Sequence, residues 1–162
     1  MQNINFLKMS HLLSRRPKAW AKINGSELYE KIKGFVGFYP GNGGVLAVSE
    51  FWGLPTSDVQ CDEPIFGMHI HEGNSCTGSE DDPFENVGSH YNPYRCPHPY
   101  HAGDMLPIFG ADGCGFSAFF TDRFTIDEII GKTVILHLSP DDFHTQPAGN
   151  SGKKIACGII RK

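Results

Sequence analysis

Short segments in which apolar and polar residues alternate, separated by glycine-rich turns, recur along the chain from Ala19 onward. The stretch AWAKIN alternates and ends at Asn24-Gly25, a pair typical of hairpin turns. The stretches IKGFVGFY and VLAVSEFWG flank the turn PGNGG, and they are rich in the aromatic and β-branched residues that strands favour. This pattern predicts two paired strands over 32–39 and 45–53.

The second half of the chain predicts further strands and one short helical turn. Thr125 and Glu128 have the spacing of a capping box, and Gly131 would end that turn. Seven or eight short strands with no sustained helical period predict an all-β protein, an antiparallel sandwich or flattened barrel. The strands expected from residue 65 onward cover 65–71, 114–122, 132–138 and 153–160.

A long segment from Glu72 to Gly110 interrupts these strands and is rich in Gly, Pro, Asn, Asp, His and Cys. Connections of this length are generally functional or disordered. Disorder is not expected, because aromatic residues and cysteines run through the segment. We therefore expect a functional loop.

Length and composition fit one globular domain. The 162 residues are 40% hydrophobic and 20% charged, which is typical of a single globular domain. Because the strand pattern begins only after Pro17, we expect an N-terminal tail over 1–17 and the domain over 18–162. No apolar run approaches the roughly 20 residues of a membrane-spanning helix. A net charge of −4 argues against a nucleic-acid partner, which would require a basic surface.

The N-terminal stretch MQNINFLKMSHLLSRRP lacks the basic start, the unbroken apolar run and the small-residue cleavage site of a secretory signal. The expected location is therefore the cytoplasm, or an extracytoplasmic compartment if a leader has been removed. Five cysteines are an odd number, so at least one is expected to stay unpaired.

Two histidines one residue apart lie inside the apolar stretch IFGMHIH. In a strand, His69 and His71 would share one face while Met68 and Ile70 point to the other. Buried imidazoles need partners, because an unpaired buried polar group costs free energy. The pair alone is consistent either with hydrogen-bonded histidines or with metal ligands.

The long loop supplies a second group of ligand-type residues within 15 positions: His90, His98, His101 and Asp104. Three imidazoles and a carboxylate form a plausible tetrahedral set for zinc. Cys96 could replace one of them, and a polar loop with hydrogen-bonded histidines is the other interpretation.

His137 ends the apolar stretch TVILH, where a histidine satisfied by the backbone would be the ordinary interpretation. Together with His69 and His71 it would form an all-nitrogen set. Imidazole nitrogens in a near-planar arrangement suit copper(II).

Five motifs occur in order along the chain: GMHIHE, GSHYNP, HPYHAGD, IIGKTVILH and GNSGKKIACGII. In these motifs the chain resembles the copper–zinc superoxide dismutase family, in its bacterial type with short loops, over roughly Ala19 to Ile160. The resemblance implies an antiparallel Greek-key sandwich or flattened barrel with long metal-binding loops. It also implies a copper ion and a zinc ion as cofactors and the superoxide anion as the substrate.

The resemblance assigns roles to individual residues. Asp141 would be a carboxylate that binds no metal itself but ties a zinc-ligating imidazole to a copper-ligating one, and Cys76 and Cys157 would form a disulfide. The copper ligands would be His69, His71, His90 and His137. The zinc ligands would be His90, His98, His101 and Asp104.

The activity implied is dismutation of superoxide to dioxygen and hydrogen peroxide by a redox-cycling copper, bridged through the imidazolate of His90 to a structural zinc. The catalytic residues would be His90 and Lys154. Lys154 stands where the family normally has an arginine that attracts the anion, so it keeps the charge but loses the two-pronged donor geometry. Slower turnover with retained activity is therefore expected.

Two other functions fit the same residues. The chain would store or deliver copper with little dismutase activity, or it would be a structural protein in which zinc alone fills the loop site. A homodimer is considered, since family members associate in different ways. Three cysteines match nothing in the family pattern: Cys61, Cys96 and Cys114.

Overall fold

The computed structural model describes residues 16–59 and 64–162. The predicted tail over 1–17 lies outside the described residues except for Arg16 and Pro17, so the division into a tail and one domain stays a prediction. No helix among the described residues is long and apolar enough to cross a membrane.

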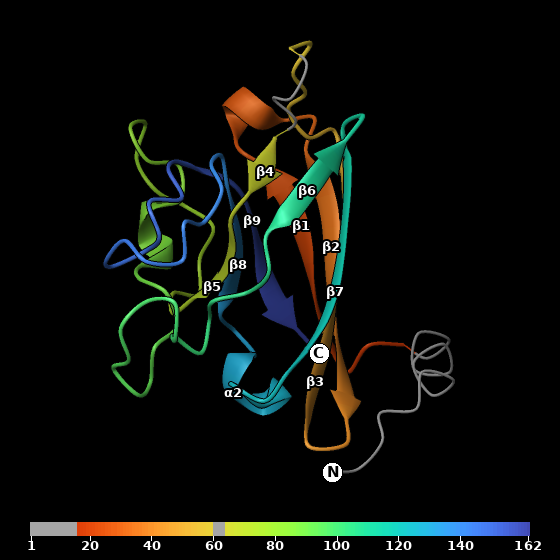
Figure 1. Ribbon diagram of the computed structural model, residues 1–162, viewed down its shortest axis with the longest axis vertical. Coiled ribbons are helices and arrows are strands. Elements are labelled where there is room, and N and C mark those ends of the chain that lie inside the picture. Colours follow the sequence, from red (N-terminus) through yellow and green to blue (C-terminus); the bar gives the residue numbers. More distant parts are fainter. Residues whose placement is uncertain (1–15, 60–63) are drawn as a thin grey trace.

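The described residues form nine strands and three short helical turns (Figure 1). The strands are β1 (Ala19–Gly25), β2 (Lys33–Gly41), β3 (Gly44–Trp52), β4 (Ile65–Phe66), β5 (Met68–His71), β6 (Ile108–Ala111), β7 (Cys114–Thr121), β8 (Thr133–His137) and β9 (Lys154–Arg161). The helical turns are η1 (Glu27–Tyr29), η2 (Glu85–Val87) and α2 (Ile126–Ile129). The expected capping box of Thr125 and Glu128 is present at the start of α2.

The strands pair antiparallel in the order β4-β6-β7-β3-β2-β1-β9-β8-β5. β4 and β5 lie at opposite ends of this order, yet only Gly67 separates them in the chain. The sheet must therefore curl until its two ends meet at Gly67. The result is the flattened, nearly closed barrel that the sequence predicts, with connections that cross between distant strands as in a Greek key.

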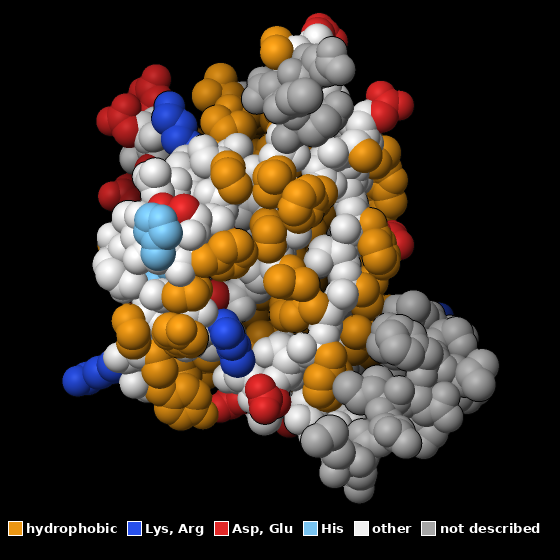
Figure 2. All heavy atoms as spheres, viewed as in Figure 1, with side chains coloured by type: hydrophobic (Ala, Val, Ile, Leu, Met, Phe, Trp, Pro, Cys, Tyr) orange, Lys and Arg blue, Asp and Glu red, His pale blue; other side chains and the backbone are white. Residues whose placement is uncertain are grey.

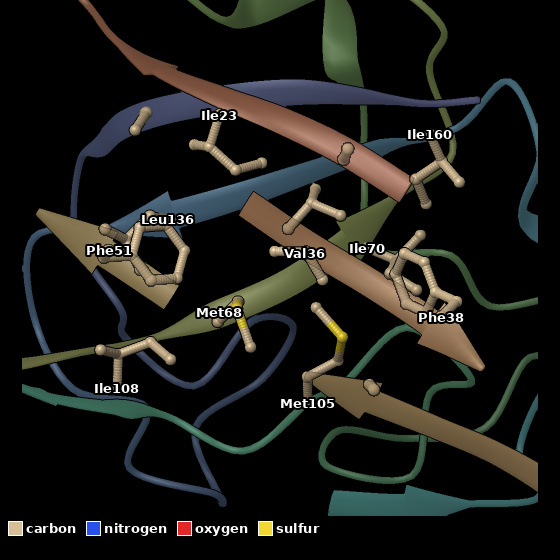
Figure 3. Packing of buried hydrophobic residues seen from close by; sticks show 14 of the residues in the cluster. Ile23, Val36, Phe38, Phe51, Met68, Ile70, Met105, Ile108, Leu136 and Ile160 are labelled. Atoms are coloured by element: carbon tan, nitrogen blue, oxygen red, sulfur yellow. The ribbon is translucent and has the colours of Figure 1, made fainter. Parts of the chain in front are cut away.

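Alternate residues of the strands fill the barrel interior (Figure 3). Val36 and Phe38 of β2 meet Met68 and Ile70 of β5 and Leu136 of β8 in one buried cluster. Because Met68 and Ile70 point inward, His69 and His71, which alternate with them along β5, point outward. This alternation places the imidazoles on the outside of the barrel wall.

Two local predictions hold only in part. The hairpin expected at Asn24-Gly25 forms, since β1 pairs antiparallel with β2, but β1 continues through Gly25 and a connection that contains η1 takes the place of a tight turn. The strand expected over 65–71 is divided at Gly67 into β4 and β5, which pair with different strands. Both outcomes depend on pairing partners elsewhere in the chain.

Two long connections cover the outer side of β5 and β8, as the green and blue segments at the left of Figure 1 show. They run over 72–107 and 138–153. On the opposite side of the barrel, hydrophobic side chains gather on the surface over β6 and β7 (Figure 2), among them Phe109, Phe116 and Phe120. The site described next lies between β5, β8 and the two connections.

Candidate metal centre

The two histidines of β5 are fully enclosed although they point out of the barrel. His69 is 0% and His71 is 4% exposed, since the two connections cover this face. His137, at the end of β8, joins them, with its Nε2 3.4 Å from the Nε2 of His71. The ring centroids of His69 and His137 are 4.9 Å apart. Three buried imidazoles thus converge from two neighbouring strands.

The long loop reaches this cluster because its backbone pairs with β5. The Ile70 N–H donates to the Gly103 carbonyl, and the Ile70 carbonyl accepts from the Tyr91 N–H, each at 2.8 Å. Gly103 is required here, because a Cβ would lie 2.3 Å from the Ile70 carbonyl oxygen. This pairing brings His90 opposite His71, and Asp104 opposite His69.

Two groups of possible ligand atoms result, each with all its atoms within 4.8 Å of one another. The groups share His90. The first consists of His69, His71, His90 and His137. The second consists of His90, His98, His101 and Asp104.

The two ring nitrogens of His90 have different surroundings. Nδ1 lies 2.8 Å from the Asp104 carboxylate and 3.4 Å from Nδ1 of His101, so it faces the second group. Nε2 is buried and has no hydrogen-bond partner among the described residues. The ring of His90 stacks on that of His69 with centroids 3.9 Å apart, so its free nitrogen lies beside the first group.

Within the part of the chain that the structure describes, two further buried ring nitrogens lack hydrogen-bond partners: Nδ1 of His69 and Nδ1 of His98. The Nδ1 of His98 is 3.1 Å from an Asp104 oxygen, but this contact does not have hydrogen-bond geometry. Unpaired buried nitrogens are costly unless a ligand satisfies them. The donor set, imidazoles with one carboxylate, matches what copper and zinc prefer, so the residues fit these ions.

Protein groups hold the other nitrogens of these rings. The Asp141 carboxylate accepts hydrogen bonds from Nε2 of His69 at 2.7 Å and Nε2 of His98 at 2.8 Å, so it links one ring of each group. Gly149 makes room for this arrangement, because a Cβ would lie 2.0 Å from the Asp141 oxygen. The Nδ1–H of His71 donates to the Gly88 carbonyl at 2.8 Å.

Burial favours the neutral form of three imidazoles of the first group. Loss of solvation, reinforced by neighbouring imidazoles, lowers the pKa of His69 and of His71 well below the usual value. Burial likewise lowers the pKa of His137 to about 4. A neutral imidazole presents a lone pair, so these side chains are ready to ligate a metal at neutral pH.

The acid of the second group is ionised. Burial alone would raise the pKa of Asp104, but the hydrogen bond from His90 and the nearby imidazoles outweigh it and lower the pKa. Burial also lowers the pKa of His101. The second group therefore contains the negative charge of Asp104, and burial favours the neutral form of His101.

Lys154 lies directly opposite His137 in the pairing of β8 with β9. Its ammonium is bound to the carboxylate of Asp82, in the long loop. Sequence analysis did not identify Asp82, because nothing in the stretch GSEDDP distinguishes one exposed acid from the next. Sequence analysis also missed Arg123, whose guanidinium donates to the Pro99 carbonyl at 2.9 Å and so holds the loop segment between His98 and His101.

The disulfide implied by the family resemblance is confirmed: Cys76 and Cys157 are bonded, which ties the long loop to β9. Cys96 and Cys114 are free, and neither belongs to the two ligand groups found among the described residues. Cys61 lies outside the described residues.

Comparison with known proteins gives a consistent picture. The family model for copper/zinc superoxide dismutase matches residues 32–160. The chain is 30% identical to the copper–zinc superoxide dismutase 2 of Aquifex aeolicus, over 97% of this chain and 94% of the relative. It is 32% identical to dismutase 1 of the same organism, over 74% of this chain and 75% of the relative.

Solved structures show the same likeness. A double mutant of a superoxide dismutase-like protein from Bacillus subtilis superposes with a TM-score of 0.74 at 28% identity, covering 88% of this chain and 97% of that one. The copper/zinc superoxide dismutase of Brucella abortus gives a TM-score of 0.73 at 24% identity, over 88% of this chain and 99% of its own, which supports the fold.

Proposed function

Because the chain belongs to the copper/zinc superoxide dismutase family, we propose that it converts two superoxide anions and two protons into dioxygen and hydrogen peroxide. The observation that carries this proposal is the pair of buried ligand groups that share His90. A storage or structural site needs only one such group, whereas a shared imidazole couples two.

The first group would hold copper through His69, His71, His90 and His137, and the second would hold zinc through His90, His98, His101 and Asp104. When bound, copper supplies one-electron exchange with superoxide, and zinc supplies a charge that does not change oxidation state. The unpaired nitrogens of His69, His90 and His98 support this assignment, since each lacks any other partner.

His90 is the group suited to move a proton. Its Nδ1 is committed to the Asp104 side, so Nε2 is the atom that can take up and release a proton beside the substrate. Imidazole exchanges protons readily near neutral pH. The proposal assigns to His90 both the link between the groups and the delivery of a proton to the reduced oxygen species.

The remaining site residues position and enclose. Asp141 orients one imidazole of each group, and the two connections exclude bulk water from the histidines. Lys154, opposite His137, supplies a positive charge at the edge of the first group. The part of this charge that Asp82 does not neutralise attracts an anion that approaches this edge.

The test begins with protein purified from copper-replete cells. Metal content and superoxide decay are measured on the wild type, on His137→Gln and on His144→Gln. His144 is a matched control, because it is 79% exposed and belongs to neither ligand group. Copper and zinc together with fast decay are expected for the wild type and His144→Gln, and loss of copper and of decay for His137→Gln.

The alternative, a copper- and zinc-binding homologue that stores or delivers metal, is favoured by one observation: the only cation assigned to the substrate is already paired with Asp82. Copper with slow decay in the wild type would support this alternative. Zinc without copper would support a structural role.

A further inference from the structure

Asp82 neutralises the one cation that the proposed function assigns to substrate attraction. Its Oδ2 lies 2.5 Å from the Lys154 ammonium. The side chain of Lys154 is 18% exposed, so this ion pair is partly shielded from solvent. Shielded pairs are screened by salt less than exposed ones.

The carboxylate of Asp82 is held in place by its own turn. Its Oδ1 accepts the Phe84 N–H at 3.1 Å, which leaves Oδ2 for the lysine. The Asp82 carbonyl accepts the N–H groups of Ser79 and Glu85, each at 3.0 Å. Gly78 is required beside this turn, since a Cβ would lie 2.0 Å from the Asp82 carbonyl oxygen.

The turn that contains Asp82 is also anchored to the barrel. Phe84 is buried with Ile135 of β8 and with Cys157 of β9, and the disulfide partner Cys76 packs against them. The ion pair is therefore a second connection between the long loop and β9, three residues from the disulfide. A carboxylate fixed in this way costs less entropy to hold in the pair than one on a free surface loop.

We propose that Asp82 is a positioning residue that sets the attraction of the site for small anions by fixing Lys154 and cancelling its charge. The inference rests on the proposed copper site. A paired ammonium presents a dipole to an approaching anion, and the potential of a dipole falls off faster with distance than that of a single charge. Removal of the Asp82 charge should therefore strengthen the attraction.

The decisive variant is Asp82→Asn, which keeps an oxygen for the Phe84 N–H and removes only the charge. Azide serves as the anionic probe, and its Kd for the copper(II) form is measured by absorption titration at low and high salt. We expect a Kd about two- to fivefold lower than in the wild type at low salt, with a smaller difference at high salt. An unchanged or higher Kd would overturn the inference.

Two controls separate the pair from general charge effects. Glu80→Gln makes the same change in net charge at an exposed acid of the same turn, and it should leave the azide Kd near the wild-type value. In the Lys154→Gln background, Asp82→Asn should no longer lower the Kd. If it lowers the Kd equally in both backgrounds, Asp82 does not act through Lys154.

A measurement without copper keeps the inference distinct from the proposed function. In the zinc-loaded protein, the reaction of Lys154 with trinitrobenzenesulfonate is compared with that of its exposed neighbour Lys153 by peptide mass spectrometry. Asp82→Asn should raise the Lys154-to-Lys153 ratio severalfold, and an unchanged ratio would contradict the pairing. If Asp82→Asn produces these effects but the wild type does not remove superoxide, only the proposed dismutase activity is refuted.

Discussion

Asp141 fixes two buried imidazoles at once, because its two oxygens accept from His69 and His98. Each ring thereby directs its unpaired Nδ1 toward a ligand group. Partners of this kind determine ring orientation and ligand basicity.

The substitution Asp141→Asn should weaken binding of both metals about 10- to 100-fold, because an amide can accept from only one of the two rings. The measurement is competition with a chelator of known affinity, for copper and zinc separately. Asp142→Asn is the matched control, since that neighbouring side chain contacts no ligand histidine among the described residues. Unchanged affinity for both metals would show that Asp141 does not orient the rings.

At Lys154, the chemistry of the side chain matters as well as its charge. A guanidinium has enough donors to bind Asp82 and still present a second prong to an anion. Lys154→Arg should therefore raise the rate of superoxide decay at low ionic strength, with metal content unchanged. An equal rate in the two proteins would show that having lysine instead of arginine at position 154 does not limit the rate of superoxide decay.

At the scale of elements, the conformation of the long loop over 72–107 depends on the contacts that attach it to the barrel. It is joined to β9 by the disulfide and by the Asp82 ion pair, and to β5 by the backbone pairing at Gly103. Few of its own residues form regular structure, so these attachments hold the ligands in place.

Replacement of Cys76 and Cys157 by serine should lower the free energy of unfolding of the metal-free protein by roughly 2–5 kcal/mol, because the bond closes a loop with a sequence separation of 81. Denaturant titration of the metal-free protein measures this change. The free and exposed Cys114 provides the control, as Cys114→Ser should change the free energy little. Equal stability of all three proteins would contradict the importance of the tether.

For the molecule as a whole, the buried histidines couple folding to pH. In the metal-free protein the pKa of His137 is about 4, below the usual 6.5, so the unfolded chain binds the proton more tightly than the folded one. Stability is therefore present above about pH 6.5 and is lost as the pH falls toward 4. This one group accounts for about 3 kcal/mol across that interval.

The corresponding measurement is the free energy of unfolding of the metal-free protein between pH 7.5 and about pH 4, for the wild type and for His137→Gln. The variant should lose less stability on acidification than the wild type does. Parallel pH profiles would show that His137 is not responsible. Bound metal should shift the loss to lower pH, since protons then compete with the ion for the same nitrogens.

Some features of the fold and site could be predicted from the sequence, and others could not. The alternation around Met68 and Ile70 correctly placed His69 and His71 on one face of a strand, because side-chain direction is a local property. The Asn24-Gly25 pair marked the end of β1 and its antiparallel pairing with β2, but not the length of the connection, because β1 also pairs with β9 through Gly25. Asp82 was missed because its partner lies 72 residues away.

The amino-acid sequence by itself determined the strand pattern, the ligand types and the order of motifs, since these depend on neighbours along the chain. Only the tertiary structure decided that residues from His69 to His137 converge on His90, which ring nitrogens stay free and which acid neutralises Lys154. Those features arise where loops fold back on the barrel. Their energies come from contacts between distant segments, and no local pattern encodes such contacts.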